Sequence, residues 1–252
     1  MTEQLHRLLR IMAILRDPQN GCEWDRAQSF ETIVPHTIEE AYEVADAVAR
    51  GDLADIRDEL GDLLFQVVFQ ARIAEEHGQF AFDDVARSIA DKLEARHPHI
   101  FAGAEAPGEA RDERWEALKA DERARRGAKS ALDGVAVALP ALLRAEKLQK
   151  RAARVGFDWP DITGPEDKLA EEISELAEAP EDKRLEEAGD LLFAAVNLVR
   201  AHGIRAEEAL RAANGKFERR FRAMEALAGG SLEGLSLDEQ EVLWQQVKRR
   251  EA

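Results

Sequence analysis

Apolar residues recur along most of this chain at spacings of three and four, which places them on one face of an α-helix. The period-two alternation that is typical of β-strands is scarce. Helix ends are marked by glycines at C-terminal capping positions, Gly51, Gly78 and Gly203, and by Pro98. The pattern therefore predicts an all-α protein, with helices at about 3–16, 37–50, 53–77, 82–97, 110–126, 139–153, 166–179, 182–202, 206–227 and 237–251.

Two helix starts also carry the sequence of a capping box, in which a Ser or Thr and an acidic residue three positions later bond each other's backbone N–H. One is Thr163 with Glu166, and the other is Ser236 with Glu239. We expect both side-chain pairs to cap their helices.

The most specific pattern in the chain is acidic and occurs twice. The first copy reads E-E-x-x-E at residues 39–43 and E-x-G-D-L-L-F at residues 59–65, and the second repeats both at residues 171–175 and 187–193. Because residues three and four apart share a helix face, each copy pairs two carboxylates on one helix and two on the next. The first set is Glu40, Glu43, Glu59 and Asp62, and the second set is Glu172, Glu175, Glu187 and Asp190.

A metal site explains this pattern better than a solvated surface does. Asp and Glu number 51 in this chain, and one isolated acidic pair would usually be exposed. However, the pattern recurs in register, and the helix that follows it is nearly all apolar at residues 63–69 and 191–196, which predicts burial. Carboxylates converge beside packed surface only around positive charge, and a hard divalent cation prefers oxygen ligands.

The repeat extends beyond the acidic pattern and divides the chain. The corresponding segments are Lys92 and Arg96 with Lys216 and Arg220, Trp115 and Lys119 with Trp244 and Lys248, and residues 21–24 with residues 156–159. Between the copies, residues 127–134 break the helical pattern ahead of Pro140. We predict a tandem duplication of one helical-bundle domain, with domains at 1–126 and 139–252 and a linker at 127–138.

Composition limits the partners and the surroundings. The 252 residues suffice for two domains with their own cores, and the net charge of −16 argues against nucleic acid or an anionic membrane as the main partner. No apolar run reaches the length of a membrane span, and the N-terminus lacks a signal-peptide core. Cys22 is the single cysteine, which excludes an internal disulfide. We expect a cytoplasmic protein.

The basic and aromatic residues of the repeat add a second kind of chemistry. Lys216 and Arg220 share a helix face, as do Trp244 and Lys248, although each alone is more often surface or core. Beside a carboxylate-bound metal they would offer cations for phosphate oxygens and a ring for stacking on a base. The combination predicts a nucleotide polyphosphate site with Mg2+, for which Mn2+ is a possible substitute.

Other chemistries fit less well. A di-iron carboxylate bundle needs two Glu-x-x-His pairs on facing helices, and only Glu94 with His97 has that spacing. The chain contains no phosphate-binding G-x-x-x-x-G-K-[ST] loop, no glycine-rich dinucleotide turn and no H-E-x-x-H segment.

The motifs together resemble those of the MazG family of nucleoside triphosphate pyrophosphohydrolases, in the all-α NTP pyrophosphatase group. The resemblance is to the two-domain bacterial form and covers nearly the whole chain, including residues 21–25, 96–101, 148–151, 155–159, 216–221 and 244–248. The spacing between Glu175 and Glu187 is short for the pattern, but the difference touches no motif residue.

The resemblance implies a Mg2+-dependent enzyme that hydrolyses nucleoside triphosphates to the monophosphate and pyrophosphate, with broad tolerance of the base, and that forms a homodimer. It implies metal binding and catalysis by Glu172, Glu175, Glu187 and Asp190. It implies nucleotide contacts from Lys168, Glu171, Glu172, Lys183, Glu186, Lys216, Arg220, Trp244 and Lys248. It leaves the general base unassigned. The alternative function is a catalytically silent nucleotide-binding regulatory module.

The two copies differ beside their carboxylates. His36 stands where the second copy has Lys168, and Asp55 stands where it has Lys183. Each position lies four residues before a carboxylate of the set and therefore shares its face. With His neutral, the first copy is less positive by one charge unit at the first position and by two at the second, where a carboxylate replaces an ammonium group, and this disfavours a triphosphate. We therefore expect residues 139–252 to be the principal catalytic domain and residues 1–126 to be a degenerate, structural or regulatory copy.

Two questions remain open from the sequence. Lys168 and Lys183 could instead form only surface ion pairs with Glu172 and Glu187, and the first copy could retain residual activity. The apolar helices at 63–74 and 191–200 need cover on several sides, which agrees with the homodimer that the resemblance implies.

Overall fold

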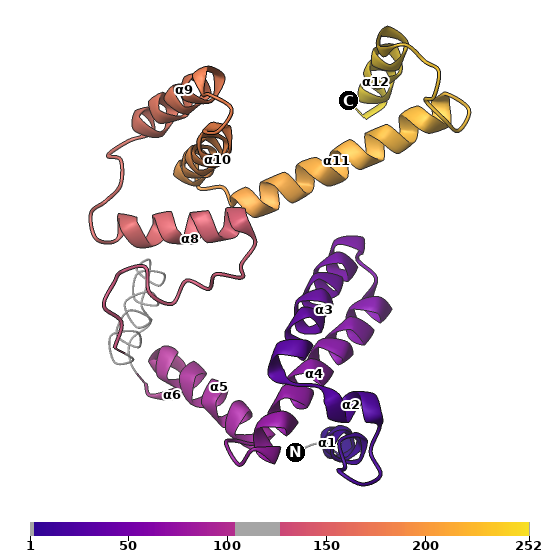
Figure 1. Ribbon diagram of the computed structural model, residues 1–252, viewed down its shortest axis with the longest axis vertical. Helices are drawn as coiled ribbons and strands as arrows, with labels where there is room; N and C mark the ends of the chain where they lie inside the picture. Colours follow the sequence, from indigo (N-terminus) through magenta and orange to yellow (C-terminus); the bar gives the residue numbers. More distant parts are fainter. Residues whose placement is uncertain (1–2, 104–126, 252) are drawn as a thin grey trace. The chain divides into compact units, whose positions relative to one another are not determined.

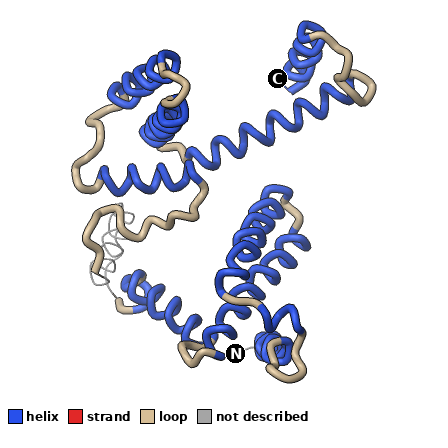
Figure 2. Tube along the Cα trace, viewed as in Figure 1, coloured by secondary structure: helices blue, strands red, loops and turns tan. Residues whose placement is uncertain are grey.

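The computed structural model describes residues 3–103 and 127–251, and every regular element within these ranges is a helix (Figure 2). The predicted all-α class is confirmed. The chain divides into two compact units, residues 1–118 and 119–252. The predicted helix at 110–126 lies outside the described residues, as do Trp115 and Lys119.

The first unit is built around a long helical hairpin. Helices α3 and α4 lie side by side, α1 packs across α4, and α5 contacts α4 near its C-terminal end (Figure 1). A turn at Gly51, in the left-handed conformation with φ 75°, ends α3 and allows α4 to fold back. The helices are α1 (Glu3–Leu15), α2 (Glu23–Ala27), α3 (Phe30–Arg50), α4 (Leu53–Glu76), α5 (Phe82–Arg96) and α6 (Pro98–Phe101).

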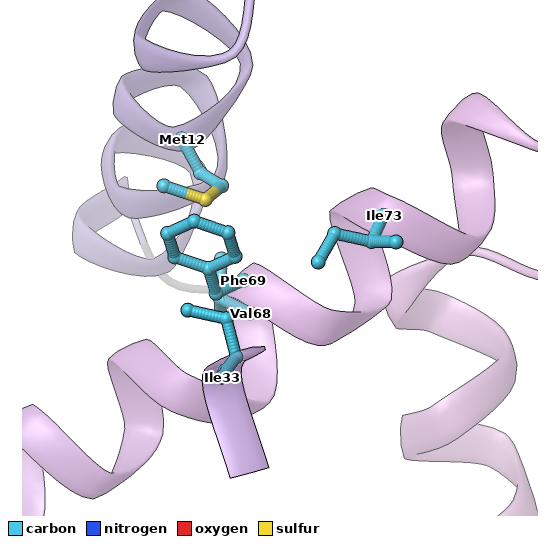
Figure 3. Packing of buried hydrophobic residues seen from close by; sticks show 5 residues of the cluster. All are labelled: Met12, Ile33, Val68, Phe69 and Ile73. Carbon is cyan, nitrogen blue, oxygen red and sulfur yellow. The ribbon is translucent and has the colours of Figure 1, made fainter. Parts of the chain in front are cut away.

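The core of this unit lies at the C-terminal half of α4. Figure 3 shows Met12 of α1 against the ring of Phe69, with Ile33, Val68 and Ile73 beside it, and all five are buried. Fully burying side chains of this size contributes roughly 1.5–3 kcal/mol each. The buried residues of α4 begin at Gln66, so the earlier turns that carry Glu59 and Asp62 lie outside this core.

The second unit repeats the hairpin but continues differently. Helices α9 and α10 lie side by side and α8 packs on α10, while α11 extends away from them and carries α12 near its distal end (Figure 1). Its compact apolar cluster is made of smaller side chains, Ala145, Val196 and Ala206. The helices are α8 (Ala141–Ala153), α9 (Thr163–Glu178), α10 (Arg184–Ala201), α11 (Ala206–Leu227) and α12 (Leu237–Glu251).

Some helix starts differ from the prediction. Helix α3 begins at Phe30 rather than near residue 37, because Ser29 and Thr32 form a reciprocal capping box ahead of Pro35. The prediction of a capping box at Thr163 was wrong, because Thr163 is already helical and no side chain caps α9. The box of Ser236 and Glu239 is present. The short helices α2 and α6 were not predicted, because four or five residues show no periodic pattern.

The expected burial of the apolar helices holds only in part. In α10, Ala194 and Val196 are buried, but Leu192 and Phe193 remain exposed, as does Leu64 of α4. Within a single chain, each hairpin is therefore buried on one side, and apolar side chains on another side remain exposed to solvent.

Candidate functional site

The first carboxylate set meets across the α3–α4 hairpin. Carboxylate oxygens of Glu40, Glu43 and Glu59 all lie within 4.8 Å of one another. Burial, a hydrogen bond with Glu43 and the charge of Asp62 together raise the pKa of Glu40. Burial and the charges of Glu43, Asp55 and Asp62 also raise the pKa of Glu59. The four predicted carboxylates of this copy thus share one electrostatic environment.

The second set meets in the same way across α9 and α10. Carboxylate oxygens of Glu172, Glu187 and Asp190 lie within 4.8 Å of one another. Glu175 is not one of these three, but its Oε2 lies 3.9 Å from Lys168 Nζ, which also contacts Glu172. Burial raises the pKa of Glu175, and the charges of Glu172, Glu171 and Glu187 raise it further against the opposing effect of Lys168. The structure therefore brings together three of the four residues that the sequence pattern singled out, and the fourth, Glu175, is near them through Lys168.

Glu172 distinguishes the second cluster from the first. Glu172 is only 4% exposed, whereas Glu40, its counterpart, is half-buried. Lys168 contacts Glu172 Oε1, but Oε2 is buried without a hydrogen-bond partner among the described residues. A buried, unpartnered carboxylate oxygen costs free energy unless a cation or donor satisfies it. The donor set of this cluster therefore fits a hard divalent cation.

Two lysines flank the second cluster. Lys168 Nζ lies 2.7 Å from Glu172 Oε1, 2.9 Å from Glu171 Oε1 and 3.9 Å from Glu175 Oε2. Hydrogen bonds to Glu172 and Glu171 raise the lysine's pKa. Lys183, at the N-terminal end of α10, pairs with Glu186 at 2.7 Å rather than with Glu187. Both ammonium groups are partly exposed and adjoin the carboxylates.

The corresponding positions of the first unit are different. His36 lies 3.6 Å from Glu39, and Asp55 pairs with Arg50 at 2.5 Å. No lysine stands at either position, and Asp55 adds negative charge beside Glu59. The geometry thus reproduces the charge difference that the sequences of the two copies indicate.

The remaining predicted contacts form a separate group on α11 and α12. The Arg220 guanidinium lies 5.6 Å from the centre of the Trp244 ring and pairs with Glu251 at 2.7 Å. Lys216 and Lys248 are exposed on the same two helices. Figure 1 shows α12 well apart from α9 and α10. Within one chain the structure does not bring these residues to the carboxylate cluster, because α11 carries them away from it.

Sequence reasoning did not single out two polar residues that line a cavity in the second unit. Gln149 of α8 and Asn197 of α10 line a cavity of about 420 Å³ together with Trp159. The sequence does carry one indication of such a residue, because Asn197 is polar and interrupts the apolar run of α10.

Comparison with known proteins supplies the family. A sequence model of the MazG nucleotide pyrophosphohydrolase domain matches residues 28–101, which include α3 to α6. The nucleoside triphosphate pyrophosphohydrolase of Escherichia coli (strain K12) is 53% identical over 258 aligned residues, covering 98% of each chain. The chain belongs to the MazG family.

Other relatives agree with this membership. The nucleoside triphosphate pyrophosphohydrolase/pyrophosphatase MazG of Thermotoga maritima is 42% identical, covering 96% of this chain and 94% of its own. The nucleoside triphosphate pyrophosphohydrolase of Mycobacterium tuberculosis is 40% identical over 60% of this chain and 46% of its own. Within the described ranges of this MazG-family protein, no helix is long and apolar enough to span a membrane.

Proposed function

We propose that this MazG-family enzyme hydrolyses nucleoside triphosphates to the monophosphate and pyrophosphate, depends on Mg2+ and tolerates different bases. The observation that carries the proposal is the cluster of Glu172, Glu187 and Asp190 with its unpartnered oxygen and adjoining lysines. The full-length relatives named as nucleoside triphosphate pyrophosphohydrolases support the same reaction. Mn2+ would substitute for Mg2+, because it also accepts oxygen ligands.

The carboxylates would hold the metal from two sides. Glu172 and Glu175 lie on α9, and Glu187 and Asp190 lie on α10, so the hairpin fixes their separation before the substrate arrives. A bound divalent ion would neutralise phosphate charge and lower the pKa of a water molecule that attacks the α-phosphorus. Burial raises the pKa of Glu175, and repulsion from Glu172, Glu171 and Glu187 adds to this effect, which a bound cation would offset.

The lysines would receive the phosphate oxygens. Lys168 and Lys183 are held by Glu171, Glu172 and Glu186, and both ammonium groups remain open to solvent. An arriving triphosphate would compete with these acidic partners for the ammonium protons and would place negative charge beside them. The same contacts would stabilise the charge that develops on the leaving pyrophosphate.

The proposal also includes the oligomeric state of the protein. We propose a homodimer, because Leu192 and Phe193 of α10 and Leu64 of α4 stay exposed in one chain. A second copy would cover these side chains. Light scattering at micromolar concentration should give twice the mass of one chain, and a fully active monomer would refute this part.

The test of function is a product analysis. Purified protein is incubated with each common nucleoside triphosphate and Mg2+, and the products are resolved by anion-exchange chromatography. Monophosphate with pyrophosphate is the expected result, whereas orthophosphate would indicate cleavage at another bond. Tight nucleotide binding without turnover would support the alternative of a silent regulatory module.

A further inference from the structure

The two carboxylate clusters have different neighbours on the second helix of each hairpin. In α4, Gln66 and Gln70 lie four and eight residues after Asp62 and continue its face towards α3. The corresponding positions of α10 hold Ala194 and Leu198. The first hairpin thus places two amide side chains beside its cluster, where the second hairpin places two apolar side chains.

The amide of Gln66 is directed at the first cluster. Gln66 is only 5% exposed, and its Nε2 donates a hydrogen bond of 3.4 Å to Glu40 Oε1 across the hairpin. Because an ionised carboxylate can only accept, the amide presents its nitrogen to Glu40. Its Oε1 is left buried, without a partner among the described residues. The contact with Glu40 therefore determines which end of this buried amide faces the carboxylates.

Gln70 makes a similar contact with a different acceptor. Its Nε2 donates a hydrogen bond of 2.9 Å to the hydroxyl oxygen of Thr37, which lies about one turn before Glu40 on α3. Both glutamines thus reach from α4 to α3, but Gln66 donates to a carboxylate and Gln70 donates to a hydroxyl group. Gln70 is therefore a matched control for Gln66.

In the second unit, the counterpart of Gln66 cannot donate to the cluster. Ala194 is buried and has no polar side-chain atom. Glu172, the counterpart of Glu40, has one oxygen in contact with Lys168, and its Oε2 is buried without a partner among the described residues. A carboxylate oxygen in this state requires a donor or a cation, and Mg2+ and Mn2+ are bound by such oxygens.

A hydrogen-bond donor and a cation compete for the same carboxylate. A cation that binds Glu40 has to displace the Gln66 amide, whose nitrogen then loses its partner in a buried place. A cation that binds Glu172 satisfies an oxygen that otherwise has no partner. The ammonium group of Lys168 is partly exposed, so water or phosphate can receive it when the cation binds. The second cluster should therefore bind a cation more tightly than the first.

We propose that Gln66 determines which of the two clusters holds the metal, because its amide satisfies Glu40 as the cation satisfies Glu172. The amide would keep the first cluster free of metal at concentrations that load the second. This inference rests on the proposed function for the presence of a metal at the second cluster. A single neutral side chain would thus separate two clusters that are built from corresponding carboxylates.

The test measures Mn2+ binding, in place of Mg2+, by calorimetric titration of the full chain without nucleotide. The parent variant Glu175→Gln with Glu187→Gln keeps only the first cluster intact. In this parent, Gln66→Leu removes the donor and should raise the Mn2+ affinity about 10- to 100-fold, the equivalent of a hydrogen bond to a charged group. Gln66→Glu replaces the donor by a further carboxylate ligand and should raise it at least as much. The control Gln70→Leu should leave the affinity unaltered.

The reciprocal change tests the second cluster. Its parent, Glu43→Gln with Glu59→Gln, keeps only the second cluster intact. In this parent, Ala194→Gln introduces the amide at the corresponding position and should lower the Mn2+ affinity about tenfold. Ala194→Leu fills a similar space without a donor and should bind Mn2+ more tightly than Ala194→Gln. If neither variant folds, as judged by circular dichroism, the first-cluster titrations decide the question.

These titrations separate the inference from the proposed function. If the parent with an intact second cluster binds no Mn2+, the proposed metal site is wrong, whereas Gln66 is still tested by the gain of affinity in the first cluster. The inference is supported if Gln66→Leu gains affinity and Gln70→Leu does not. It is overturned if folded Gln66→Leu and Gln66→Glu bind Mn2+ no more tightly than their parent. It is also overturned if the two parents bind Mn2+ equally well.

Discussion

The two units share a helical hairpin on which three carboxylates converge, but different side chains pack beside that hairpin in each unit. In the first unit, Met12 and Phe69 belong to a buried apolar cluster. In the second, Gln149 and Asn197 line a cavity, and Lys168 adjoins the carboxylates. The comparison shows that similar hairpins can adjoin side chains of different polarity, apolar at Phe69 and amide at Asn197.

The first unit also contains an ion pair that stabilises its filled interior. The guanidinium of Arg16 is nearly buried and contacts Glu76 at 2.7 Å, and it also donates to the backbone oxygens of Asp25 and Gln28. These bonds join the end of α1, the short helix α2 and the end of α4. Aligning Asp62 with Asp190 sets Ile204 against Glu76, so the second unit lacks this acidic partner. The second unit instead has an ion pair of Arg200 on α10 with Asp158 in the loop after α8.

The largest effect is expected from the lysines that only the second unit has. Lys168→Met combined with Lys183→Met should lower kcat/KM for ATP by about 10²- to 10⁴-fold, since each removes a charge-assisted contact to phosphate. The matched double variant His36→Met with Asp55→Asn should change it by less than about threefold, because these positions carry no positive charge towards phosphate. Equal losses in both double variants, measured by pyrophosphate release, would contradict the proposed difference between the units.

A stability difference should follow from the ion pair of the first unit. Glu76→Gln would leave the Arg16 charge buried without its partner, and breaking a buried pair in this way costs about 3–5 kcal/mol of unfolding free energy. The neighbouring change Glu75→Gln removes an exposed pair with Arg72 and should cost less than about 1 kcal/mol. Urea unfolding of the two variants measures the difference. A Glu76→Gln variant as stable as Glu75→Gln would show that Arg16 needs no acidic partner.

The same pair predicts a smaller dependence of stability on pH. Burial raises the pKa of Glu76, but hydrogen bonds from Arg16 and Arg72 lower it more, so the net pKa is below its ordinary value of 4.5. A depressed folded-state pKa contributes stability above the unfolded-state pKa, and this contribution is lost as pH falls through the folded-state value. The stability gap between wild type and Glu76→Gln should therefore be full at neutral pH and shrink below pH 4.5. A gap that stays constant into acid would refute this assignment.

The parts of the site that depend on local spacing could be predicted from the sequence. The i, i+3 pairs at Glu172 and Glu187 lie on adjacent helices of a hairpin, so helical periodicity and a short connection suffice to bring them together. The same holds for Lys168, which lies one turn before Glu172. These contacts follow from helical spacing and from one short connection.

The parts that depend on tertiary direction could not be predicted. Periodicity places Trp244 and Lys248 on one face of α12, but it does not say that α11 carries this helix away from α9 and α10 (Figure 1). The orientation of Gln149 depends on a bond to the backbone of Phe193, which is distant in sequence. The early start of α3 at Phe30 was concealed by Pro35, which usually indicates a helix boundary.

The central claim is that the second unit carries out the reaction, and paired charge-neutral variants test it most directly. Pyrophosphate release from ATP and Mg2+ is compared between Glu175→Gln with Glu187→Gln and the matched pair Glu43→Gln with Glu59→Gln. The second-unit pair should lower the rate by about 10²- to 10³-fold or more, on the scale of a lost electrostatic contact to the transition state. The first-unit pair should stay near wild type. If the first-unit pair abolishes release while the second-unit pair does not, the assignment of the two units is wrong.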